Sequence, residues 1–161
     1  MNILVCGGAG FIGSTFIINY LKNNPNSQIT NLDILTIGSN LQNLKDLKNN
    51  SNYKFIQDDI RNESVVDTLV KDTDVIINFA AESHVDRSIA NPKPFLETNI
   101  LGTYSILEAT RKHDTQFIHV STDEIYGDAN EKLSFDENSQ INPSNPYAAT
   151  KAAADHLVSS Y

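Results

Sequence analysis

The sequence is short of cysteine, of basic residues and of long apolar runs. Cys6 is the single cysteine among 161 residues, so no disulfide can form within the chain. Lysine and arginine number 12 against 20 aspartates and glutamates, and without a basic cluster a nucleic-acid partner is not expected. No apolar run is long enough to span a bilayer, and Met1 leads directly into an apolar strand rather than a signal peptide. We therefore expect a cytoplasmic protein without a membrane partner.

What remains is the composition of an ordinary globular domain, with 40% hydrophobic residues, 7 glycines and 5 prolines. Short apolar runs alternate with helical patterns, which predicts a doubly wound parallel sheet in a three-layer α/β/α (Rossmann) fold. Five strands are expected, over about residues 3–6, 28–32, 53–57, 74–79 and 117–120. Four helices are expected, over about residues 11–21, 63–71, 94–112 and 147–161, with residues 35–52 left as a loop containing at most one helical turn.

A glycine-rich turn follows the first strand. Gly7, Gly10 and Gly13 have the spacing Gly-x-x-Gly-x-x-Gly between a strand and a helix, which favours tight turning and close approach to a pyrophosphate at the helix N-terminus. Such a motif alone also describes a simple tight turn. Asp33 ends the second strand 20 positions after Gly13, where a dinucleotide site needs a carboxylate for the ribose hydroxyls. Because Ile34 follows instead of an arginine, NAD is favoured over NADP.

A second cluster follows the fifth strand and continues into the last helix. Thr122, Asp123 and Glu124 place a hydroxyl and two carboxyl groups side by side at a strand end. Tyr147 and Lys151 are four apart, so they share one face of a helix. A lysine beside a phenol lowers the pKa of that phenol, so Tyr147 is a candidate base. Alone, the Tyr-x-x-x-Lys pattern fits a solvated helix surface equally well.

Two further strand ends offer cofactor contacts. Asp58 and Asp59 follow the third strand, and Ala80 and Ala81 follow the fourth, at the edge where parallel sheets bind ligands. Small residues such as the two alanines let a cofactor lie close to the backbone. Capping of the next helix is an equally good interpretation of either aspartate.

These motifs together resemble a known family, the extended short-chain dehydrogenases/reductases that act on nucleotide sugars. Within it the chain is most similar to the dTDP-glucose 4,6-dehydratases. The resemblance spans residues 1–161 and is carried by the glycine-rich turn, Asp33, Tyr147-x-x-x-Lys151 and the segments 80–88, 97–103 and 121–127. The adjacent Asp123 and Glu124 are its most specific element, because related epimerases are not expected to carry both carboxylates.

The resemblance implies an NAD-dependent lyase. Tyr147, helped by Thr122 and Lys151, would accept the proton of the sugar 4-hydroxyl. Glu124 would act as the base at carbon 5. Asp123, kept protonated in a buried site, would act as the acid at the 6-hydroxyl. Ser83 and Thr122 would face the sugar. The NAD contacts, which include the three glycines of the turn, would be Gly7, Gly10, Phe11, Ile12, Gly13, Asp33, Asp59, Ile60, Ala80, Ala81, Ser83, Thr98, Tyr147 and Lys151. Asp58 stands where the family usually has glycine.

The chain ends ten residues after Lys151, whereas the family continues with another strand and a smaller substrate-binding lobe. We therefore expect residues 1–161 to form the NAD-binding domain with the catalytic residues, to lack the C-terminal lobe and to have little activity alone. A homodimer through the apolar helix 94–112 and the last helix is also implied. Which nucleotide and sugar are selected is not readable from these residues.

Two other functions remain open. A nucleotide-sugar 4-epimerase shares the oxidation step but needs no acid–base pair for elimination, and a non-catalytic NAD-binding fragment needs neither. No metal site is expected, since the four histidines lack metal-ligand spacing. His113, His119 and His156 are expected to be structural or solvated, and Cys6 a small core residue.

Overall fold

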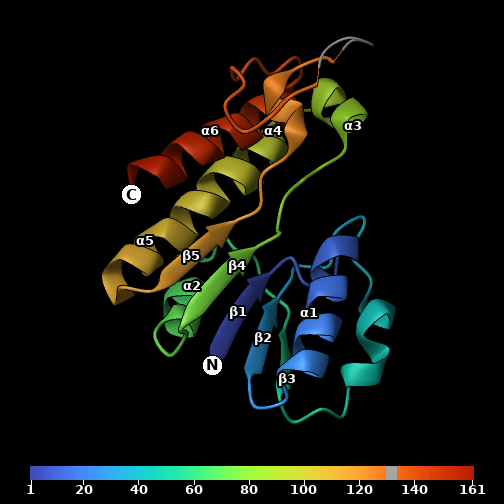
Figure 1. Cartoon of the computed structure of the whole chain (residues 1–161), viewed down its shortest axis with the longest axis vertical. Helices are drawn as coiled ribbons and strands as arrows, with labels where there is room; N and C mark the ends of the chain where they lie inside the picture. The colour runs from blue at the N-terminus through green and yellow to red at the C-terminus, as the bar shows by residue number, and fades with distance from the viewer. Residues whose placement is uncertain (130–133) are drawn as a thin grey trace.

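A parallel sheet of five strands forms the centre of the molecule (Figure 1). The computed structural model describes residues 1–129 and 134–161. The strand order is β3-β2-β1-β4-β5, and all neighbouring pairs are parallel. The strands are β1 (Asn2–Cys6), β2 (Gln28–Leu32), β3 (Tyr53–Ile56), β4 (Val75–Asn78) and β5 (Gln116–His119). The predicted fold class is thus confirmed, with each strand boundary within two residues of its expected place.

Helices cover both faces of this sheet (Figure 1). Their bounds are α1 (Phe11–Asn23), η1 (Leu41–Leu47), α2 (Glu63–Val70), α3 (Val85–Ala90), α4 (Lys93–Phe95), η2 (Leu96–Gly102), α5 (Thr103–His113), η3 (Asp123–Tyr126) and α6 (Pro146–Ser160). The one turn expected within residues 35–52 corresponds to η1, whereas α3 was not predicted. The pattern between the fourth strand and residue 94 is too short and polar to have indicated it.

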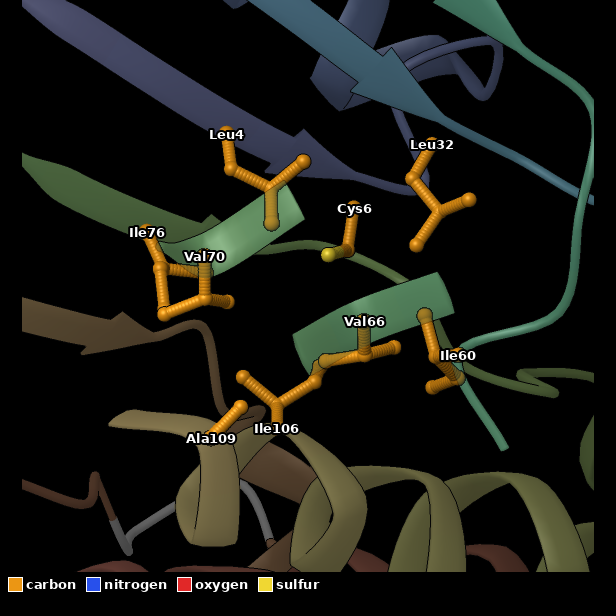
Figure 2. Packing of buried hydrophobic residues seen from close by; sticks show 9 residues of the cluster. All are labelled: Leu4, Cys6, Leu32, Ile60, Val66, Val70, Ile76, Ile106 and Ala109. Atoms are coloured by element: carbon orange, nitrogen blue, oxygen red, sulfur yellow. The ribbon is translucent and has the colours of Figure 1, made fainter. Parts of the chain in front are cut away.

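Side chains of β1 alternate between two cores. Leu4 and Cys6 point to the face covered by α2 and α5, where they meet Val66 and Ile106 (Figure 2). Ile3 and Val5 point to the opposite face, where α1 and η1 pack. Alternation along a strand buried on both sides explains why its sequence is continuously apolar. Cys6 is the expected core residue, and burial raises the pKa of its thiol to about 12.

The predicted helix 94–112 is wrong in its geometry. The path is continuous, but residues Leu96–Gly102 form a π-helix between α4 and α5. Periodicity does not separate the two helix types over seven residues, and π turns are frequent at functional sites. Gly102 packs closely there, since a β-carbon at this position would lie 2.5 Å from Cδ1 of Ile60 and would force that side chain to move.

Candidate active site

A cavity of about 510 Å³ lies at the carboxyl ends of the strands. Every residue predicted to contact NAD lines it: Gly7, Gly10, Phe11, Ile12, Gly13, Asp33, Asp59, Ile60, Ala80, Ala81, Ser83, Thr98, Tyr147 and Lys151. Residues from four strand ends and three helices thus meet in one place, as expected for an open parallel sheet. Sequence reasoning missed other lining residues, among them Arg61, Glu97 and Ser121.

The glycine-rich turn is held by close backbone packing. Gly7 has a left-handed φ of 77°, and a β-carbon there would lie 2.5 Å from the backbone nitrogen of Ala80. Gly10 is the N-cap of α1 and offers no side-chain acceptor to the first turn of the helix. The free N–H groups of that turn therefore face the cavity, which suits an anionic phosphate.

Substitution of Gly13 by alanine should weaken NAD binding. The added β-carbon would lie 2.5 Å from the carbonyl oxygen of Gly7 and 2.8 Å from Cα of Gly8, so the turn must move. We expect the affinity for NAD to fall at least about tenfold, from the usual cost of overpacking. Calorimetric titration with NAD measures this, with Lys22→Ala at the exposed end of α1 as control. Unchanged affinity in a folded Gly13→Ala variant would contradict the assignment.

Asp33 is buried, and both of its carboxylate oxygens accept backbone N–H groups. Oδ2 accepts from Ala9 at 2.9 Å and Oδ1 from Leu35 at 2.8 Å. A carboxylate has about four acceptor directions, so two remain for hydroxyl groups. The carboxylate therefore supports the glycine-rich turn and the loop after β2 as well as facing the cavity.

The two aspartates after β3 organise the start of α2. Oδ1 of Asp58 accepts from the side chain of Asn62 at 3.0 Å, and Oδ2 of Asp59 accepts from Nε of Arg61 at 2.8 Å. Burial raises the pKa of Asp59, but the hydrogen bonds and charge of Arg61 outweigh it and hold that pKa below its usual value. Ile60 lines the cavity only at its margin, since its side chain belongs to the core in Figure 2.

Asn99, which sequence reasoning missed, ties the β4 loop to α6 from the π-helix. Its side chain accepts from the N–H of Glu82 at 2.9 Å and donates to the carbonyl of Glu82 at 3.0 Å. It also donates to Oγ1 of Thr150 at 3.0 Å. A fully buried amide satisfied on three sides fixes its neighbours strongly. Asn99 thereby sets the position of Ala81 and Ser83 relative to the helix that carries Tyr147.

Thr122, Asp123 and Glu124 lie beside the cavity rather than in its lining. The hydroxyl of Thr122 caps η3 by accepting from the N–H of Glu124 at 3.3 Å. Oε2 of Glu124 accepts from the side chain of Asn145 at 3.2 Å, and Asn145 is itself the N-cap of α6. The expectation that Asp123 lies in a buried site is wrong for this domain, because the residue is exposed. Its role as an acid stays a prediction.

Tyr147 does not have the lowered pKa that its spacing to Lys151 predicted. Burial raises the pKa of the phenol, a hydrogen bond with Thr122 lowers it, and the charges of Glu124 and Asp123 raise it further. The net result is a pKa of Tyr147 above the ordinary value for a phenol. The prediction fails because the Nζ atom of Lys151 is directed elsewhere, into the end of β5.

Lys151 is almost fully buried and contacts two groups of that strand end. Nζ donates to the carbonyl of Val120 at 2.7 Å and lies 3.2 Å from Nε2 of His119. Burial lowers the pKa of Lys151 to about 8, and the charge of Asp155 opposes the shift. Burial, followed by the charge of Lys151, lowers the pKa of His119 to about 3. His119 is therefore part of this site and not a solvated strand residue.

This buried histidine should make the fold sensitive to acid. The unfolded chain protonates His119 below pH 6.5, whereas the folded chain does so only near pH 3, so stability is lost as the pH falls through that window. Between pH 7 and pH 5 the contribution amounts to about 2 kcal/mol. Urea unfolding at pH 7 and at pH 5 measures this. The decrease in unfolding free energy between the two pH values should be larger by this amount in the native sequence than in His119→Gln. Equal decreases in the two proteins would contradict the lowered pKa of His119.

The other histidines lie away from this cluster. His84 is exposed before α3, His113 contacts Asp67 through Nε2 at 2.9 Å, and His156 is exposed on α6. Within residues 1–129 and 134–161, no three or more His, Cys, Asp or Glu side chains are grouped to hold a metal. In the same ranges, no helix has the length and apolarity needed to cross a membrane.

The decisive comparison is with a family model. Residues 4–161 match the model described as GDP-mannose 4,6 dehydratase. The chain belongs to this family. Among curated relatives, the dTDP-glucose 4,6-dehydratase of Mycobacterium tuberculosis is 45% identical over 160 residues, which are 98% of this chain and 48% of the relative. The low-salt glycan biosynthesis protein Agl12 of Haloferax volcanii is 48% identical and is covered to 52%.

Solved structures agree with this membership. The dTDP-glucose 4,6-dehydratase DesIV of Streptomyces venezuelae, crystallised with NAD, is 40% identical with a TM-score of 0.95, over 100% of this chain and 51% of that one. The UDP-glucose 4-epimerase of Thermus thermophilus, also with NAD, is 31% identical with a TM-score of 0.87, over 100% and 50%. The chain thus spans about half the length of the relatives it matches. The resemblance seen in the sequence is confirmed.

Proposed function

We propose that the chain is the NAD-binding domain of a dTDP-glucose 4,6-dehydratase and carries its catalytic residues. The observation that supports this most is the position of Asp123 and Glu124 next to Ser121 of the cavity that the glycine-rich turn and Asp33 also line, with Glu124 held by the N-cap residue of the helix that carries Tyr147. The choice of dTDP-glucose as the substrate rests on the similarity to relatives that are named dTDP-glucose 4,6-dehydratase. We place the protein in the cytoplasm and expect the choice of nucleotide to depend on residues outside this domain.

The cavity suits NAD by its own geometry. The uncapped start of α1 would receive the pyrophosphate, Asp33 keeps free acceptor directions for a ribose, and the two alanines after β4 leave room for a flat ring. When bound, NAD would supply a hydride acceptor for carbon 4 and, once reduced, a hydride donor for carbon 6. Tyr147 and Lys151 line the same cavity and therefore reach the ribose and the sugar hydroxyl.

The residues of the chain perform the proton transfers. Tyr147 accepts the proton of the 4-hydroxyl as a phenolate, the form that its hydrogen bond with Thr122 favours. The ketone formed at carbon 4 makes the proton at carbon 5 acidic, and Glu124 removes that proton. Asp123 protonates the departing 6-hydroxyl, so one proton is taken and one is given by adjacent carboxyl groups.

The product distinguishes this function from the alternatives. Incubation of this chain, and of a full-length protein that contains it, with NAD and dTDP-glucose should give a 4-keto-6-deoxy sugar only in the full-length case, read by NMR. A dTDP-galactose product would identify the 4-epimerase. Bound NAD without product in both proteins would identify a non-catalytic NAD-binding domain.

We also propose a homodimer through η2, α5 and α6. Leu96 is 48% exposed, Leu101 56% and Tyr104 40%, which places three large side chains in water on one stretch of helix. The substitution Leu101→Lys should shift sedimentation from dimer to monomer, because a charge in an apolar interface leaves a buried unpaired ion. Ile37→Lys, on the loop after β2, is the matched control. A monomeric native protein would contradict the proposal.

A further inference from the structure

The side chain of His119 is enclosed between Asn78 and Lys151. It is 4% exposed and sits at the end of β5 beside the end of β4. Its Nδ1 lies 3.3 Å from Nδ2 of Asn78, and its Nε2 lies 3.2 Å from Nζ of Lys151. Neither the proton transfers above nor the cofactor cavity uses this imidazole, so its position needs another explanation.

Asn78 fixes which imidazole nitrogen carries the proton. Oδ1 of Asn78 accepts from the N–H of Ala80 at 3.0 Å, so the NH₂ end of this buried amide must face His119. Nδ1 can then only accept a hydrogen bond. In a neutral imidazole the proton consequently resides on Nε2 and points toward Lys151.

An N–H group directed at Lys151 is compatible with a neutral amine and not with an ammonium ion. The neutral amine donates to the carbonyl of Val120 at 2.7 Å and accepts from Nε2 of His119 with its lone pair. An ammonium ion has no lone pair, so two donors would face each other. Burial lowers the pKa of Lys151 to about 8, so the neutral amine becomes the main form only above that pH.

We propose that His119, oriented by Asn78, is a positioning residue that allows Lys151 to release and take up a proton instead of remaining a fixed cation. When Lys151 gains a proton, a small rotation of the imidazole ring directs its Nε2–H group toward Oδ1 of Asp155, which lies 3.6 Å from Nε2. Asp155 is held in place by the hydroxyl of Ser121. No covalent bond other than the one to the transferred proton changes.

Within residues 1–129 and 134–161, the titratable groups that face Lys151 or its neighbour Tyr147 are His119 on β5, Asp155 and Tyr147 on α6, and Asp123 and Glu124 on η3. Burial disfavours the ammonium form of Lys151 and the charge of Asp155 favours it. The orientation of His119 adds a donor that faces Nζ. The proposal concerns the proton on Lys151 and stands independently of the proposed reaction.

Side-chain NMR of the chain tests this directly. Nitrogen-15 spectra should show His119 neutral with its proton on Nε2 at pH 6 to 9, and the carbon-13 shift of Cε should report the titration of Lys151, assigned with Lys151→Arg. In His119→Gln, the amide oxygen accepts from the ammonium ion, so the titration midpoint should rise by roughly one pH unit. His156→Gln, exposed on the same helix, should leave the midpoint unchanged.

Asn78→Asp provides a second variant that keeps the histidine. A carboxylate oxygen facing Nδ1 should move the imidazole proton to Nδ1, so that Nε2 accepts from Lys151 and the Lys151 midpoint rises. A proton on Nδ1 in the native sequence would overturn the proposal. So would an unchanged Lys151 midpoint in either folded variant, which would leave His119 a packing residue only. Loss of activity of the full-length enzyme in these variants without a shifted midpoint would count against it equally.

Discussion

Replacement of Tyr147 by phenylalanine should lower the turnover of the full-length enzyme by about 10³-fold, the usual contribution of a placed general base. Tyr147 is the one predicted catalytic side chain that lines the cavity, is half-buried and contacts Thr122. Without the phenol, no group beside the cofactor accepts the proton of the 4-hydroxyl. The backbone at this position should survive, because the N–H of Tyr147 donates to Oγ of Ser88 at 3.1 Å and the ring packs edge-on against Phe95.

The structure makes the controls specific. Phenylalanine keeps the contact between the two rings, so NAD affinity and unfolding temperature should change little while turnover falls. Tyr20→Phe on α1, away from the cavity, should leave turnover intact. A Tyr147→Phe variant that binds NAD and turns over at the native rate would contradict the proton-transfer role.

Replacement of Glu124 by glutamine should separate oxidation from elimination. The amide oxygen of glutamine still accepts from Asn145, so the local geometry is kept while the base at carbon 5 is lost. We expect elimination to slow by about 10²-fold or more. Reduced NAD should then accumulate within one turnover, visible as near-ultraviolet absorbance. Rapid elimination in this variant would show that another group removes the proton.

Asp123→Asn is the companion variant for the acid. Asparagine cannot protonate the leaving 6-hydroxyl, so the variant should bind NAD and oxidise the sugar but lose elimination. Asp114→Asn at the end of α5 is a suitable control, since asparagine tolerates the left-handed φ of 51° found there. Unchanged dehydration in Asp123→Asn would remove this residue from the mechanism.

The fold and the cofactor cavity were predictable because their signals are local. The glycine spacing, the position of Asp33 and the alternation of apolar runs each follow from chain geometry that any sequence of this kind must satisfy. Parallel strands then bring their carboxyl ends to one edge. For this reason strand-end residues as distant as Gly7 and Ala80 could be expected in one cavity, whereas Lys151, on helix α6, was placed there through the family resemblance.

The polar contacts that orient the site were not predictable in the same way. Asn99 acts through partners 17 and 51 residues away, and His119 through Asn78 at a distance of 41 residues. No spacing rule covers such pairs. The four-residue spacing of Tyr147 and Lys151 correctly gives a shared helix face, but a buried amine needs hydrogen-bond partners and finds them on β5.

In the proposed reaction, one hydride leaves carbon 4 and returns to carbon 6 while water is lost. This transfer can be followed with dTDP-glucose carrying deuterium at carbon 4, converted by a full-length protein that contains this chain, with the product analysed by NMR. We expect a 4-keto-6-deoxy product with the deuterium at carbon 6 and no net consumption of NAD. A product that keeps its deuterium at carbon 4, as in an epimerised sugar, would contradict it.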